Sequence, residues 1–238
     1  MSSLVHSSTL VTAGVFLLIR REPTSGLLFE GFIWVPCITL LFSCLRACLS
    51  FDLKRVIAMS TLGHLSLIFL SLFLGYSLLS YFHLLTHALF KSLLFIRAGN
   101  AINFIKGSQD IRDMGGLLCA LPIRRQSIIL SVLSLMGFPF SSGFFSKDII
   151  VEARACCLQD GNFFSGALVR LSIPISIFYR ARLCYFLFCC SPSFPVELGT
   201  ERNCCMVGPL TRLGVVSVCL GSVIRSFFVS FDFVMVLK

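Results

Sequence analysis

The sequence is poor in charged residues. Of its 238 residues only 13% are Asp, Glu, Lys or Arg, whereas 56% are hydrophobic, and the mean hydropathy is +0.92. Soluble globular domains carry roughly 25% charged residues, so this composition excludes that class of protein. We predict an all-α polytopic membrane protein, surrounded by the lipid bilayer.

Acidic residues are scarcer than basic ones. The chain has 11 Asp and Glu against 20 Lys and Arg, which gives a formal net charge of +9. In a soluble protein this excess would suggest nucleic acid, but here the basic residues fall mainly at the ends of apolar runs, where they anchor helices and set their orientation. We therefore expect no nucleic-acid partner.

The sequence also lacks the patterns that hold metals and redox cofactors. Its 12 cysteines include no C-x-x-C pair, so we interpret them as small buried hydrophobic residues. His83 and His87 have the spacing to share a metal ion or a haem, but Leu84 stands where the zinc-protease pattern H-E-x-x-H has its glutamate. We predict that no metal, flavin, iron-sulfur cluster or quinone is bound by this chain, with metal or haem binding kept as a minor alternative.

Seven apolar runs are long enough to cross a bilayer. They lie at approximately 4–20, 27–49, 55–75, 78–104, 126–152, 163–189 and 211–231. The fifth run is interrupted around Gly137, Pro139 and Gly143, and it contains Lys147. Backbone groups freed by such a break must find partners in protein or in a hydrated cavity, and an intramembrane charge is usually functional. We predict about seven transmembrane helices, one of them discontinuous, and a role in ion movement.

A second group of ionisable residues lies in the fourth run. His83, His87 and Lys91 recur every four residues and so share one helical face. Because histidine gains and loses a proton near neutral pH, the stripe suits proton transfer through water, although structural contacts between helices remain an alternative. His6 is ambiguous between a packed and a relay residue, and Lys54 stands where snorkelling to the interface is the simpler interpretation.

Five sequence blocks between residues 4 and 148 occur in an order that resembles one known family, the subunit 5 family of NADH:ubiquinone oxidoreductase (respiratory complex I). The blocks are His6 to Gly14, Asp52 to Leu62, Phe82 to Phe95, Gln109 to Gly116, and Gly137 to Asp148. Beyond about residue 190 the resemblance is weak.

The resemblance implies an antiporter-like subunit, which in that family has two inverted repeats of five helices and a central polar axis. Residues 27–190 match the second repeat, preceded by a helix within 1–26 and followed by a loop and a C-terminal transmembrane helix within 191–238. The first repeat, with its glutamate and its own lysine, has no counterpart here. By motif, the axis residues are Lys147, His83, His87 and His6, while Lys91 and Lys54 lie within matching blocks.

Three residues depart from the family pattern. Arg97 places a guanidinium where the family has an uncharged residue, His64 replaces a residue that is usually glutamine, and Arg180 is an additional charge. Arg182, in contrast, fits the family. The long lateral amphipathic helix of the family is not evident either, because 212–238 is predicted to be one apolar span and a short tail.

From the resemblance we expect a proton-translocating membrane-arm subunit, partial in extent, that couples electron transfer from NADH to quinone to proton pumping. NADH, FMN, iron-sulfur clusters and ubiquinone are expected on partner subunits, and another chain is expected to supply the missing first repeat. The expected location is the mitochondrial inner membrane, made inside the organelle because no cleavable signal is visible, with a bacterial-type membrane as the alternative. The alternative functions are a structural or assembly subunit without conduction and an independent cation/proton antiporter.

Overall fold

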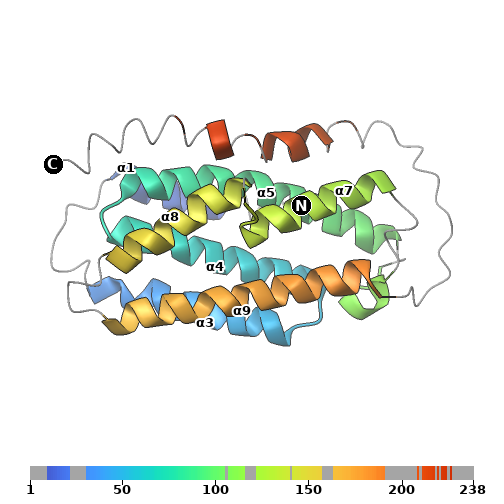
Figure 1. Cartoon of the computed structure of the whole chain (residues 1–238), viewed down its shortest axis with the longest axis horizontal. Helices are drawn as coiled ribbons and strands as arrows, with labels where there is room; N and C mark the ends of the chain where they lie inside the picture. The colour runs from blue at the N-terminus through green and yellow to red at the C-terminus, as the bar shows by residue number, and fades with distance from the viewer. Residues whose placement is uncertain are drawn as a thin grey trace.

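The computed structural model describes most of the chain as a bundle of helices. The described residues are 10–21, 31–104, 107–115, 122–139, 141–156, 163–190, 208, 211–217, 219, 221–223 and 226. The helices are α1 (Leu10–Arg20), α3 (Trp34–Leu49), α4 (Leu53–Phe73), α5 (Ser77–Phe104), the 3-10 turn η2 (Ile111–Met114), α7 (Pro122–Met136), α8 (Ser142–Cys156) and α9 (Phe163–Phe188). They run mainly along the long axis of the molecule (Figure 1). The predicted helical fold class is confirmed for these residues.

Two of the described helices are long and apolar enough to cross a membrane. They are α4, with 21 residues and a hydropathy of 1.9, and the stretch Ser77–Asn103 of α5, with 27 residues and a hydropathy of 1.3. At 1.5 Å per residue α4 is about 31 Å long, close to the roughly 30 Å of a bilayer's hydrocarbon core. Helices α1 and α3 are apolar but shorter. Within the predicted span 211–231, the described residues are helical.

Helix α4 lies at the centre of the packing. It contacts α3, α5 and α8, and in Figure 1 it runs between α3 and α9 on one side and α5 and α8 on the other. Its buried residues lie on more than one face, as expected for a helix enclosed by protein. Of the ionisable side chains on α4, His64 is buried against other helices, whereas Lys54 and Arg55 in its first turn are exposed.

The run predicted as one interrupted span forms two helices, α7 and α8. Helix α7 ends in a Schellman motif: Gly137 takes a φ of +78°, its N–H bonds Ser134 O at 3.3 Å, and the N–H of Phe138 bonds Leu133 O at 3.1 Å. Gly143, in the first turn of α8, lies so near the end of α7 that an added Cβ would overlap Ser134 O. The turn and this close approach set where α8 starts.

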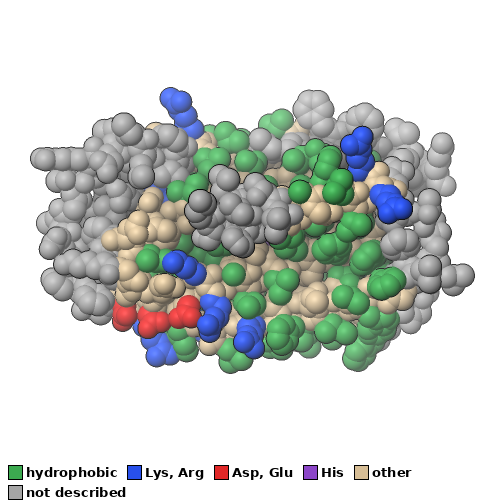
Figure 2. All heavy atoms as spheres, turned by 180° about the vertical axis from the view of Figure 1, so that it is seen from behind, with side chains coloured by type: hydrophobic (Ala, Val, Ile, Leu, Met, Phe, Trp, Pro, Cys, Tyr) green, Lys and Arg blue, Asp and Glu red, His purple; other side chains and the backbone are tan. Residues whose placement is uncertain are grey.

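On the face drawn in Figure 2, acidic side chains are confined to one end, whereas basic side chains appear at both ends. Figure 2 shows hydrophobic side chains over much of one face, with the visible acidic side chains gathered at one end beside several basic ones. Backbone hydrogen bonds connect the segment between α3 and α4 to the segment around η2. Leu53 N–H donates to Gln109 O at 2.9 Å, and Ile111 N–H donates to Phe51 O at 3.0 Å. We call residues 47–55 with η2 the polar joint.

Candidate functional site

The buried charged side chains that the structure describes are all basic. They are Lys91, Arg97, Lys147, Arg154 and Arg180, each at most 6% exposed. Three histidines, His64, His83 and His87, are buried with them. Buried charges are costly without a partner, so within a membrane protein such a concentration marks a candidate functional site.

Four helices bring most of these groups together. His64 lies on α4, His83 on α5, Lys147 on α8 and Arg180 on α9, so no two of these residues come from the same helix. The break between α7 and α8 matters here, because Lys147 lies in the second turn of α8, close after the Gly143 approach. The site therefore depends on how the helices pack rather than on any single segment.

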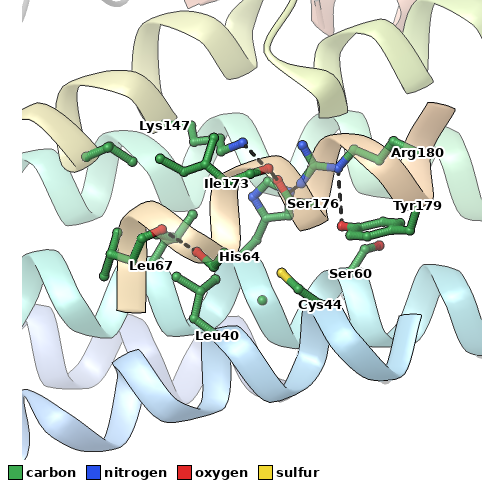
Figure 3. A pocket seen from close by; sticks show the side chains of 14 residues that line it. Leu40, Cys44, Ser60, His64, Leu67, Lys147, Ile173, Ser176, Tyr179 and Arg180 are labelled. Carbon is green, nitrogen blue, oxygen red and sulfur yellow. Dashed lines mark hydrogen bonds between the residues drawn. The ribbon is translucent and has the colours of Figure 1, made fainter. Parts of the chain in front are cut away.

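A small cavity lies between α3, α4, α8 and α9, and Lys147, His64 and Arg180 line it together (Figure 3). The Lys147 ammonium is 3.5 Å from Ser176 Oγ on α9. The cavity volume is about 20 Å³, and roughly 10–15 Å³ is enough to hold one water molecule. With lysine, imidazole and hydroxyl groups in its wall, the cavity offers a water the polar partners that it needs.

Hydrogen bonds continue from the cavity to a second helix pair. Arg180 NH2 lies 3.2 Å from His64 Nε2, and His64 Nδ1 lies 3.3 Å from His83 Nε2. The other ring nitrogen of His83, Nδ1, lies 2.9 Å from Ser146 Oγ on α8. Thr86 on α5 also contacts the Ser146 hydroxyl, at 3.1 Å. An unbroken series of polar contacts thus joins α9, α4, α5 and α8.

His87 packs beside this series. Its ring centroid is 5.3 Å from that of His64 and 6.3 Å from that of His83, and the ring of Phe90 meets it edge-on at 5.5 Å. Among the described residues neither ring nitrogen of His87 has a hydrogen-bond partner. Buried imidazole nitrogens are normally satisfied by protein or by water, so the two unpartnered nitrogens of His87 are an exception that needs an explanation.

Lys91 connects α5 to the same cavity through α4. Its ammonium donates to Ile57 O at 3.4 Å and to the Ser60 hydroxyl, and Ser60 itself lines the cavity. Lys91 and Lys147 therefore approach one cavity from different helices, one directly and one through a serine.

Four of the six site residues predicted from the sequence lie at or next to the cavity. Lys147, His83, His87 and Lys91 are buried around the cavity or one contact from it. Lys54 has an exposed side chain, and at ten residues before His64 it lies about 15 Å away along α4. His6 lies outside the described residues.

Sequence reasoning missed the two residues at the centre of the contacts. His64 and Arg180 were noted only as departures from the family, yet they touch each other, and both line the cavity with Lys147. The sequence signal that could have paired them is that both differ from the family pattern. Arg97, the third departure, lines a separate, mainly apolar cavity with residues such as Leu94 and Leu183.

The arrangement suits proton transfer between neighbouring groups. Imidazole both accepts and donates a proton, lysine carries or releases one, and the serine and threonine hydroxyls can relay one. All lie in an enclosed region next to a cavity large enough for water.

Comparison with known proteins places the chain among respiratory and antiporter membrane subunits. Residues 1–169 match the transmembrane family described as NADH:quinone oxidoreductase/Mrp antiporter. NADH-ubiquinone oxidoreductase chain 5 of Locusta migratoria is 48% identical over 78% of this chain and 32% of that protein. The Rattus norvegicus protein of the same name is 33% identical over 97% of this chain and 37% of that protein. The predicted resemblance to subunit 5 is confirmed.

Two solved structures share the fold. A chain of the membrane-bound sulfane sulfur reductase, an archaeal respiratory membrane complex, superposes with a TM-score of 0.75 at 25% identity, covering 91% of this chain and 44% of that one. A chain of the Mrp complex from Dietzia sp. DQ12-45-1b gives a TM-score of 0.67 at 19% identity, covering 82% and 45%. The present chain thus spans about a third of the length of the curated relatives and under half of these structures. Membrane neighbours with this fold support the membrane-spanning nature inferred from composition.

Proposed function

We propose that this chain, which belongs to the NADH:quinone oxidoreductase/Mrp antiporter family of transmembrane proteins, translocates protons in the membrane arm of an NADH:ubiquinone oxidoreductase. The relatives named NADH-ubiquinone oxidoreductase chain 5 support this assignment. The observation that carries it is the continuity of protonatable groups across three helices, from Lys147 on α8 through the cavity to His64 on α4 and His83 on α5.

In the proposed path Lys147 exchanges protons with the histidines through water in the cavity. His83 receives them by way of His64, and His87 receives them through water at its unpartnered nitrogens. Lys91 communicates with the cavity through Ser60. His6 continues the path towards a partner subunit, and Lys54, being exposed, acts only at the mouth of the path if it takes part.

We further propose that α7 and α8 are the two halves of one discontinuous membrane helix within the second antiporter-like repeat, 27–190. Broken helices that meet near the bilayer midplane are the usual setting of ion sites in transporters. The turn at Gly137 and the close approach at Gly143 support this, because they place Lys147 immediately after the break and against the cavity.

The driving force would come from partner subunits. Moving one charge through about 100 mV costs about 2.3 kcal/mol, so coupling of that order per proton has to reach the site. NADH, FMN, iron-sulfur clusters and ubiquinone are assigned to other subunits of the complex. We assign the complex to the mitochondrial inner membrane, in keeping with the animal sources of the relatives.

Two other functions are less well supported. A structural subunit without conduction would not need lysines and histidines arranged around a water-sized cavity, because apolar residues fill buried space at lower cost. An independent cation/proton antiporter is less well supported because the relatives at 33–48% identity are named NADH-ubiquinone oxidoreductase chain 5.

The decisive variant is Lys147→Ala in the assembled complex. Loss of this group should reduce the protons pumped per NADH or the turnover, measured in vesicles by the quenching of a pH-sensitive dye. Arg170→Ala is the matched control, since Arg170 is an exposed basic residue on α9 and its loss should change neither quantity. Unchanged pumping after joint replacement of His83, His87 and Lys147 would favour the structural subunit, and cation-dependent proton exchange without NADH would favour the antiporter.

A further inference from the structure

Two of the three residues that depart from the family pattern meet in the fold. His64 on α4 and Arg180 on α9 are 116 positions apart in the sequence, and Arg180 NH2 lies 3.2 Å from His64 Nε2. Both side chains are almost fully buried, at 2% and 3% exposure. A buried guanidinium needs an acceptor, and an imidazole nitrogen supplies one where an aliphatic residue would not. The contact indicates that the two departures form one functional unit.

The direction of each hydrogen bond follows from Arg180. A guanidinium only donates, so Nε2 of His64 must be the acceptor, and in the neutral ring the proton is then on Nδ1. His64 Nδ1–H donates to His83 Nε2 at 3.3 Å. His83 therefore carries its own proton on Nδ1, which donates to Ser146 Oγ at 2.9 Å. The Ser146 hydroxyl donates onward to Ser142 O at 3.1 Å. All four bonds point the same way, away from Arg180.

We propose that Arg180 is a positioning residue that holds His64 in the tautomer able to pass a proton to His83. This inference rests on the proposed function and names the group that orients its histidine chain. Ring tautomers of a buried histidine are set by the partner of the other nitrogen. Here a donor-only side chain with a permanent charge makes the choice, which a glutamine or a hydroxyl would leave open because each can also accept.

The transfer step balances with one proton. The Lys147 ammonium releases a proton through water in the cavity to His64 Nε2, and the Nδ1 proton of His64 passes to Nε2 of His83. Lys147 is then a neutral amine, His83 is an imidazolium, and His64 is neutral again with its proton on Nε2. Before the next transfer His64 returns to the Nδ1–H tautomer by releasing its Nε2 proton to the cavity water and taking up one proton from water at Nδ1, and renewed donation from Arg180 to Nε2 favours that form.

Arg180 has room for the movement that this step requires. Its NH2 group occupies the position at which a proton enters His64, so the guanidinium must turn aside. Arg180 lines both the cavity that it shares with Lys147 and a second cavity of about 10 Å³. Its Nε donates to Tyr179 OH at 3.2 Å, and NH1 has no hydrogen-bond partner among the described residues. Because the guanidinium is planar, turning NH2 away from His64 also turns Nε–H away from Tyr179 OH, so both contacts change together.

The test compares Arg180→Gln with Arg180→Lys in the assembled complex. Infrared spectra of ring-15N-labelled histidine distinguish Nδ1–H from Nε2–H, and subtraction of the His64→Gln spectrum isolates His64. We expect the Nδ1–H band in the wild type, its retention in the lysine variant, and a mixture in the glutamine variant. Because two tautomers of similar energy share the population about equally, pumping in the glutamine variant should fall by about half.

A double variant separates the effect of Arg180 on the His64 tautomer from its effect on packing. In a His64→Gln complex, Arg180→Gln should cause no further loss of pumping, because there is no tautomer left to set. An equal loss in both backgrounds, or an unchanged Nδ1–H band in Arg180→Gln, would overturn the inference. Failure of the proposed function has a different signature: Lys147→Ala would leave pumping intact whatever the His64 spectrum shows.

Discussion

Arg180 and Arg182 lie two residues apart on α9, yet they serve two different regions. Arg180 points into the cavity and contacts the ring of His64 and the hydroxyl of Tyr179. Arg182 contacts the polar joint, and its guanidinium lies 5.0 Å from the ring centre of Phe51. It donates to three backbone carbonyls at the end of α3, those of Ala47, Cys48 and Ser50.

The difference lies in what each guanidinium binds. Carbonyl oxygens at a helix C-terminus lack intrahelical partners and carry partial negative charge, so a cation there stabilises the helix end. A backbone carbonyl cannot take up or release a proton, whereas the histidine bound by Arg180 can. The polar joint therefore stabilises the fold, and the buried group around the cavity carries the proposed function.

Gly143→Ala should reduce assembly and pumping more than any other substitution considered, because it displaces the helix that carries Lys147. A Cβ at this position would overlap Ser134 O, so α8 would have to shift together with Lys147. Overpacking costs typically 1–3 kcal/mol, and a clash with backbone lies at or above the top of that range. We expect little assembled complex on a native gel. Gly99→Ala is the control, since a Cβ there meets nothing within 4 Å, and normal Gly143→Ala assembly would show that the approach is not required.

Arg182→Met should weaken the polar joint and leave the cavity intact. Three carbonyl oxygens would lose a charged donor, and hydrogen bonds to charged groups contribute about 1.5–3 kcal/mol each at most, with incomplete additivity. We expect a clearly lower thermal stability of the complex with unchanged pumping per assembled complex. Arg182→Lys should recover part of the stability. Reduced pumping at full stability would contradict the division between the two regions.

Lys91→Met and Lys54→Met compare a buried lysine with an exposed one. Lys91 contacts the cavity wall at Ser60, so its loss should reduce pumping while the shape-matched methionine preserves packing. Lys54 is exposed at the start of α4, and its replacement should have little effect on pumping. An equal reduction in both variants would place Lys54 within the path and extend the functional region to the polar joint.

Arg55→Ala should have the smallest effect. Arg55 Nε lies 3.6 Å from Asp52 Oδ2, with the two side chains 58% and 40% exposed. Exposed ion pairs of this kind contribute about 0–1 kcal/mol, so thermal stability and pumping should both stay close to the wild type. A loss as large as that of Arg182→Met would show that the joint depends on surface charge rather than on the capped carbonyls.

Much of the helical architecture was predictable from the sequence, because long apolar runs leave few alternatives to helices in a bilayer. The bounds of α4 and α5 lie within two residues of those predicted. The interruption at Gly137 was also visible, since glycine and proline mark the end of a helix locally. The contacts of the site were less accessible. His83, His87 and Lys91 share a helix, so their grouping follows from spacing alone, but His64 is brought to His83 only by the packing of α4 on α5.

By itself the sequence determined that this chain is helical and apolar, that one apolar run is interrupted around Gly137, and which lysines and histidines lie within the apolar runs, because these properties follow from composition and local spacing. The tertiary structure decided which of them meet. It made Arg182 a cap and Arg180 a partner of His64, and left Lys54 exposed, because those outcomes depend on distances between helices that no local pattern encodes.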